Sequence, residues 1–186
     1  VSTRPPFGEA IRRVLSRPWI GDVDPVPALY EAIETFGPIR EDLPGLIRLI
    51  EVRPHATSSV LPLIKKLEPS AASVLHDAVP LIDSFDTALS LLTAGWELDP
   101  RAPSSDEVVA ALWGKAKQPA EKTSLLGAIA SSPIPAFRQA RLARYFHRIG
   151  DAKDRTIIID GISEWVPSPE TWNILAEALH DQPEVR

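Results

Sequence analysis

The chain has 186 residues, with 20 Lys and Arg against 25 Asp and Glu, which gives a formal net charge of −5. It has no cysteine, and this excludes disulfides, thiolate nucleophiles and cysteine metal ligands. No run of about 18 apolar residues occurs, so we expect no transmembrane helix, and the N-terminal stretch is too charged for a secretory signal. The acidic balance argues against a dedicated nucleic-acid binder, and we expect a cytoplasmic location.

Apolar residues recur along most of the chain with a period close to 3.6, which predicts helices and no strands. In chain order, we expect helices near residues 6–16, 24–36, 42–52, 59–68, 70–76, 78–94, 105–113, 119–131, 135–149, 154–165 and 169–180. The polar residues expected to cap helix starts are Asp24, Asp42, Ser59, Asp77, Ser104 and Ser168.

Proline recurs in a pattern of apolar-Pro-x-apolar. The five prolines of this pattern are Pro27, Pro44, Pro62, Pro80 and Pro135, and the first four lie 17, 18 and 18 residues apart. Proline suits the first turn of a helix because the N–H groups there lack intrahelical partners. The step therefore predicts one helical hairpin per roughly 35 residues.

Two distant stretches of the chain are similar to each other. The stretch 20-IGDVDPVPALYEAI-33 parallels 149-IGDAKDRTIIIDGI-162, and each has Ile-Gly-Asp, a short polar stretch and then an apolar helix. Gly suits a left-handed turn between helices, and Asp can bond the N–H groups at the start of the next helix. We interpret the two stretches as copies of one repeat.

The Ile-Gly-Asp junctions, together with 26-VPAL-29 and 52-VRPHATSSVLPL-63, resemble short HEAT-like repeats of the kind found in phycobilin-lyase-type proteins. The resemblance implies an all-α fold: an α-solenoid, or right-handed superhelix, of about five HEAT-like helical hairpins. We expect one domain over residues 1–186. The stretch 96–106 is interpreted as an inter-repeat loop, with a weak subdomain seam as the alternative.

No motif in the sequence points to catalysis. Neither a Gly-rich phosphate loop nor a Gly-x-Ser-x-Gly elbow occurs. The four histidines, His55, His76, His147 and His180, are not spaced as a helix-borne metal pair. The tryptophans are interpreted as packing residues, with a binding surface as the alternative. We therefore expect no enzyme activity, no cofactor and no metal.

The most unusual feature is a basic segment in this acidic chain. Residues 137–155 carry Arg138, Arg141, Arg144, Arg148, Lys153 and Arg155 against Asp151 and Asp154, a net +4 where the remainder carries −9. On a helix, Arg141, Arg144 and Arg148 form one strip beside the apolar stripe. Their repulsion is offset either by the helix dipole and acids of neighbouring helices, such as Asp160, Glu164 and Glu170, or by a bound anion.

The resulting hypothesis is a non-enzymatic protein-binding or scaffold module without membrane partners. Its candidate contact residues are Arg138, Arg141, Arg144, Arg148 and Arg155, which would face acidic groups of a protein partner. The first alternative is binding of a nucleic-acid phosphate backbone by the same strip, for which Lys65-Lys66 and Lys115, Lys117 and Lys122 are the other basic candidates. The second is a lyase-like cofactor-binding enzyme, which rests on the resemblance alone.

Overall fold

The computed structural model describes residues 5–16, 24–102, 105–132, 134–149, 151–162, 168–178 and 180. These residues form eleven α-helices and three short 3-10 helices, with no strand among them. The predicted all-α class is therefore confirmed. In the described part of the chain, no helix combines the length and the apolar character needed to cross a membrane.

The chain divides into two compact units, residues 1–108 and 109–186. The first unit contains α1 (Phe7–Leu15), α2 (Val26–Phe36), η1 (Arg40–Asp42), α3 (Leu43–Val52), η2 (Pro54–Ala56), α4 (Thr57–Ile64), α5 (Ala71–Ala78), η3 (Val79–Leu81) and α6 (Phe85–Leu98). The boundary falls within α7 (Ser105–Lys115), and the second unit continues with α8 (Pro119–Ala130), α9 (Pro135–Phe146), α10 (Ala152–Ile162) and α11 (Pro169–Ala178). The boundary lies just beyond the stretch 96–106, and the expectation of a single domain stays a prediction.

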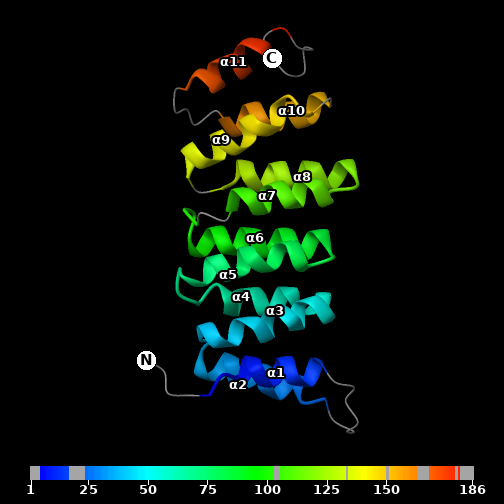
Figure 1. The fold of residues 1–186 in the computed structure, drawn as a ribbon, viewed down its shortest axis with the longest axis vertical. Helices are drawn as coiled ribbons and strands as arrows, with labels where there is room; N and C mark the ends of the chain where they lie inside the picture. Colours follow the sequence, from blue (N-terminus) through cyan, green and yellow to red (C-terminus); the bar gives the residue numbers. More distant parts are fainter. Residues whose placement is uncertain are drawn as a thin grey trace. The chain divides into compact units, whose positions relative to one another are not determined.

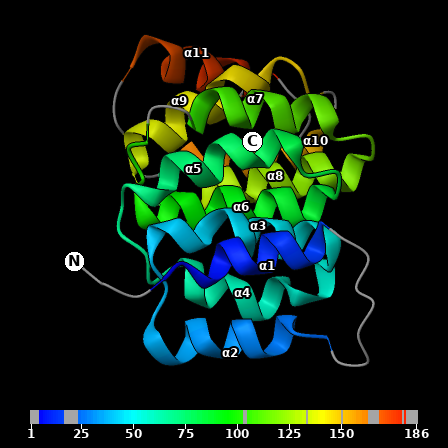
Figure 2. The same ribbon diagram turned by 60° about the horizontal axis from the view of Figure 1, so that its bottom comes forward.

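Within each unit, the helices pack on near neighbours in the chain (Figures 1 and 2). In the first unit, α1 packs on α2 and α3, α3 on α4 and α5, and α6 on α4 and α5. In the second unit, α8 packs on α9 and α10, while α11 packs on α9 and α10. The apolar stripes supply the core, as in α3, where Leu43, Leu46, Leu49 and Ile50 are all buried.

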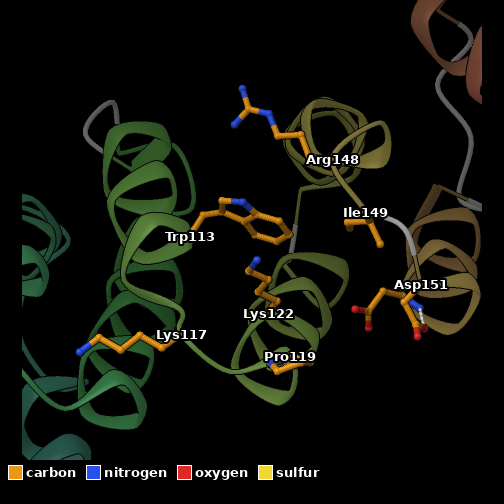
Figure 3. A pocket seen from close by; sticks show the side chains of 8 residues that line it. Trp113, Lys117, Pro119, Lys122, Arg148, Ile149 and Asp151 are labelled. Carbon is orange, nitrogen blue, oxygen red and sulfur yellow. Dashed lines mark hydrogen bonds between the residues drawn. The ribbon is translucent and has the colours of Figure 1, made fainter.

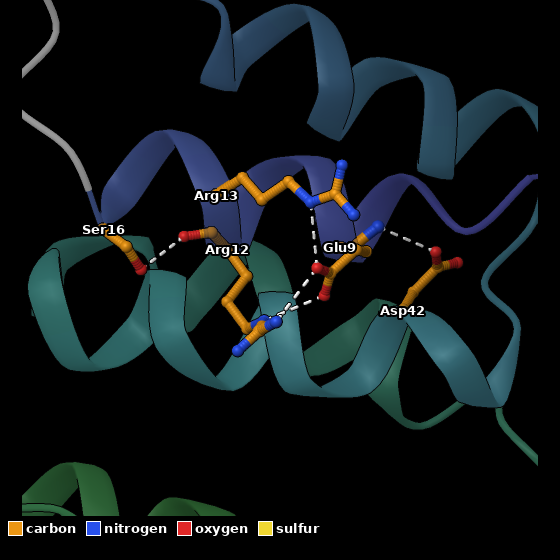
Figure 4. A network of polar contacts seen from close by, with 6 residues as sticks. Glu9, Arg12, Arg13, Ser16 and Asp42 are labelled. Carbon is orange, nitrogen blue, oxygen red and sulfur yellow. Dashed lines mark hydrogen bonds and ion pairs between the residues drawn. The ribbon is translucent and has the colours of Figure 1, made fainter.

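The crossing of α1 and α3 depends on two glycines and on the carboxylate of Asp42, which Figure 4 shows. A Cβ atom on Gly8 would overlap the backbone of Asp42, and one on Gly45 would overlap the backbone of Gly8. The buried Asp42 side chain accepts hydrogen bonds from the N–H groups of Gly8 and Ile39, both at 3.0 Å. Asp42 therefore satisfies backbone donors at the starts of two helices, α1 and η1, and lets them lie in close contact.

On the exposed side of α1, Glu9 is held by two arginines (Figure 4). Its carboxylate accepts hydrogen bonds from Arg12 at 2.8 and 2.9 Å and from Arg13 at 3.0 Å. The Arg12 hydrogen bond, followed by that of Arg13, lowers the pKa of the Glu9 carboxyl from 4.5 to about 2. These bonds favour the charged carboxylate.

A lowered pKa in the folded state sets the sign of the pH dependence at Glu9. Its contribution to stability is fully present above pH 4.5 and is lost as the pH falls through about 2. We expect the double change Arg12→Gln/Arg13→Gln to raise the Glu9 pKa toward 4.5, measured by NMR titration of its carboxyl carbon. Lys66→Gln, far from Glu9 in the sequence, is the control. A Glu9 pKa that stays near 2 in the double variant would show that Arg12 and Arg13 do not lower it.

Two of the predicted helix caps are confirmed and two are wrong, whereas Asp42 stands at the N-cap position of α3 but makes no side-chain cap hydrogen bond to it. The carboxylate of Asp24 accepts from the N–H of Val26 at 3.0 Å, and Ser168 Oγ accepts from the N–H of Thr171 at 3.2 Å. Ser59 lies inside α4 and Asp77 inside α5, so neither begins a helix. Ser104 and the junction at residues 20–22 lie outside the described residues.

The predicted single helix over 78–94 is wrong, because the chain breaks there into η3 and α6. Pro80 lies in η3, and α6 has its own cap at Ser84, whose Oγ accepts from the N–H of Thr87 at 3.4 Å. The prediction that the regularly spaced prolines lie in the first turns of helices is only partly confirmed. Prolines 27, 44 and 135 lie in first turns, whereas Pro62 lies inside α4.

Candidate functional site

The five arginines proposed from the sequence do not share one exposed surface. Arg141 is only 4% exposed, and it therefore belongs to the interior. Arg138 is half-buried and donates to the carbonyl oxygen of Ala130 at 3.3 Å. Arg155 Nε donates to the carbonyl oxygen of Ile149 at 2.9 Å. We therefore leave Arg138, Arg141 and Arg155 out of the candidate site.

The exposed remainder of the strip is Arg144 and Arg148. Helix α9 packs on α8, α10 and α11, so its buried face is wider than its apolar stripe. Position 141 falls at the edge of that wider face, which explains why a residue placed beside the stripe by helical spacing is buried. The expectation that Arg141 lies in a strip open to a partner is thus corrected.

Arg148 lines a pocket of about 220 Å³ in the second unit (Figure 3). The side chains come from α7, the loop after it, α8, the turn that follows α9 and the start of α10. They are Trp113, Lys117, Pro119, Lys122, Arg148, Ile149, Asp151 and Asp154. In Figure 3 the indole lies between Lys122 and Arg148, whereas the ammonium group of Lys117 points away from it.

The aromatic ring that lines this pocket, that of Trp113, packs against the ring of Tyr145. The rings of Trp113 and Tyr145 lie with their centroids 4.4 Å apart and their planes tilted by 31°. Lys122 Nζ lies 5.4 Å from the centroid of the Trp113 ring, and the Arg148 guanidinium lies 5.9 Å from that of Tyr145. Cations at this range are attracted by the negative ring faces. Trp113 therefore packs against Tyr145 and also lines the pocket, and the alternative of a binding surface stays a prediction for it.

The cations of the pocket, Lys117, Lys122 and Arg148, have no carboxylate partner in a salt bridge of the described residues. By contrast, Lys65 is paired with Glu97 at 2.7 Å and Arg53 with Asp24 at 2.6 Å. The charges of Lys122 and Arg148 are thus available to an anion brought by another molecule.

The two carboxylates of the pocket are engaged by the fold. Asp151 Oδ1 accepts from the N–H groups of Lys153 at 2.8 Å and Asp154 at 3.3 Å, so it caps α10 as the sequence predicted for an Asp at this junction. Asp154 is buried, and its Oδ1 accepts from the hydroxyl of Thr123 at 2.6 Å. The pocket therefore has a cationic side without a salt bridge among the described residues, and an acidic side that stabilises the packing of α8 and α10.

A second pocket, of about 430 Å³, lies between α9 and α11. It is lined by Gln139, Ala140, Ala143, Arg144, His147, Asn173 and Ile174. Gln139 Nε2 donates to Thr171 Oγ1, and His147 Nδ1 lies 3.2 Å from Glu177 Oε2, so contacts join the two helices near both ends of the pocket. We call this pocket the α9–α11 groove.

Sequence reasoning found Arg148 but missed the residues around it. Lys117 and Lys122 entered only as further candidates for phosphate binding, and Trp113 chiefly as a packing residue. These side chains lie on separate helices and loops, so no local spacing could bring them together with Arg148. No group of three or more His, Asp or Glu that could hold a metal occurs in the described ranges.

Comparisons of the chain with protein-family models, with curated proteins and with solved structures found no match in any of the three. The HEAT-like resemblance therefore stays a prediction. The observations that bear on function are therefore those of the second unit, above all the pocket lined by Trp113, Lys122 and Arg148.

Proposed function

We propose that the helices form an α-solenoid, a right-handed superhelix of about five HEAT-like hairpins. The helix contacts given above support it, because they join helices that are one or two places apart in the chain. Repeat proteins have this pattern, since each repeat buries its apolar face against its neighbours. Such stacks commonly present extended surfaces to protein partners.

We propose further that the chain is a non-enzymatic binding module that holds an acidic segment of a partner protein in the pocket around Trp113. One observation carries this proposal: Lys122 and Arg148 lie beside an aromatic pair, at a pocket, and neither has an ion-pair partner in the described part of the chain. A partner carboxylate placed between them would gain charge-assisted hydrogen bonds.

The acidic side of the pocket favours a protein segment over a nucleic acid. A phosphate backbone carries a negative charge at every nucleotide, and some of these charges would approach Asp151 and Asp154. A peptide can instead place one acid against Arg148 and present neutral groups or N–H donors to Asp151. The engagement of both carboxylates by the fold also supports a binding role over acid–base catalysis.

The test selects peptides from a random displayed library on the full chain and measures their affinity by fluorescence anisotropy. We expect the selected peptides to be acidic. Lys122→Gln/Arg148→Gln should weaken them at least about a hundredfold, since hydrogen bonds to charged groups are worth about 1.5–3 kcal/mol each and the double change removes two. The matched control is Arg40→Gln/Lys66→Gln, which removes two exposed cations from the first unit. Equal affinities in all three proteins would contradict the proposed function.

A further inference from the structure

We propose that the partner-binding surface continues from the Trp113 pocket across α9 into the α9–α11 groove. The occupant is one segment of a partner protein, with an acidic residue at Arg148 and an aliphatic side chain in the groove. This inference rests on the proposed function, and it specifies which chemistry the same partner must carry.

Each pocket is lined by an arginine at or just beyond the C-terminal end of α9. Arg148 lines the Trp113 pocket, and Arg144, four residues earlier, lines the groove. Side chains four residues apart lie on the same face of a helix, separated by about 6 Å along its axis. Both arginines are exposed, so a segment lying across this turn reaches both pockets within a few residues.

The groove has an apolar floor. Ala140 and Ala143 of α9 face Ile174 of α11, and the small alanine side chains leave the space between the helices open. Its volume of about 430 Å³ falls within the range of sites that take organic ligands. Because the contacts Gln139–Thr171 and His147–Glu177 join the helices near both ends, this space is a bounded groove. It accepts aliphatic side chains.

The charges at the groove specify the sign of the occupant. Helix α9 contains no acidic residue, and Arg148, which no salt bridge of the described residues includes, directly follows it. Glu177 of α11 contacts His147 at 3.2 Å. A segment that carries acids beside its aliphatic residue is therefore complementary to the surface, whereas a basic segment is repelled.

The test uses the peptides selected on the full chain and measures their binding to a variant whose groove is filled by a larger side chain. Ala140 is exposed, so Ala140→Trp places an indole in the groove without overpacking the core. We expect this change to weaken the selected peptide at least tenfold. The matched control, Ser124→Trp, adds the same side chain at an exposed position of α8 that does not line either pocket, and should change the affinity less than twofold.

A second measurement keeps the test independent of the folding of Ala140→Trp. Replacing the aliphatic residue of the peptide by alanine should weaken binding to the parent chain at least tenfold, with little further loss in Ala140→Trp. If the peptides depend on Lys122 and Arg148 but on neither of these changes, this inference is wrong and the proposed function stands. If no peptide is enriched, or none depends on Lys122 and Arg148, both are wrong.

Discussion

Replacement of Gly45 by alanine is expected to destabilise the first unit by about 3 kcal/mol. The new Cβ would overlap the carbonyl group of Gly8, and backbone atoms, unlike a flexible side chain, have no alternative rotamer. Either α1 moves away from α3, or the hydrogen bond from Gly8 to Asp42 is lost. Helix propensity alone predicts the opposite sign, since alanine is favoured over glycine by about 1 kcal/mol in a helix.

Two other helical glycines supply the control for this prediction. Cβ atoms added to Gly114 and Gly127 would meet nothing within 4 Å. We expect Gly114→Ala and Gly127→Ala to stabilise the chain by roughly 0.5–1 kcal/mol. Hydrogen exchange followed by mass spectrometry separates the effects by helix, and in Gly45→Ala the loss of protection should concentrate in α1 and α3. Stabilisation by Gly45→Ala would show that the close crossing is not a constraint.

In the second unit, Trp113→Ala should cost about 2–3 kcal/mol of stability. This lies at or below the usual cost of truncating a buried tryptophan, because Trp113 is only half-buried. The ring that packs against Tyr145 is lost, and Lys122 loses the aromatic face beside it. Trp113→Phe keeps a ring in place and should cost about 1 kcal/mol. Hydrogen exchange in α9, which carries Tyr145, reports both changes.

Trp172 is the matched control, since it is 59% exposed on α11. Trp172→Ala should cost less than about 0.5 kcal/mol, as is usual for surface substitutions. If Trp113→Ala leaves hydrogen exchange in α9 unchanged, the indole has no packing role. The claim that the Trp113–Tyr145 contact stabilises the site is then wrong.

Helical periodicity predicted the all-α class and most of the helices. It gave one helix instead of two elements where η3 and α6 share one apolar pattern. The helix expected at 119–131 is Pro119–Ala130 in the structure, and Pro119 begins it. Across 78–94 the apolar residues continue through the break at η3, although Leu81 is 75% exposed there. Spacing does not distinguish a continuous helix from two helices that bury the same side.

The candidate site was less accessible from the sequence, for a different physical reason. The excess of positive charge drew attention to Arg148, which lines the Trp113 pocket. Helical spacing alone could not show that Arg141 is buried, because burial depends on how many helices cover α9. Nor could it bring Lys122 of α8 and Trp113 of α7 to the end of α9, since that convergence exists only in the folded unit.

Selection on a charge-reversed chain tests the central claim most directly. The peptide selection is repeated on Lys122→Glu/Arg148→Glu, with hydrogen exchange confirming that the second unit remains folded. Since no salt bridge of the described residues includes either cation, reversal should leave the fold intact. The account predicts acidic peptides from the parent chain and basic peptides from the reversed chain. Enrichment of the same acidic peptides by both proteins would contradict it.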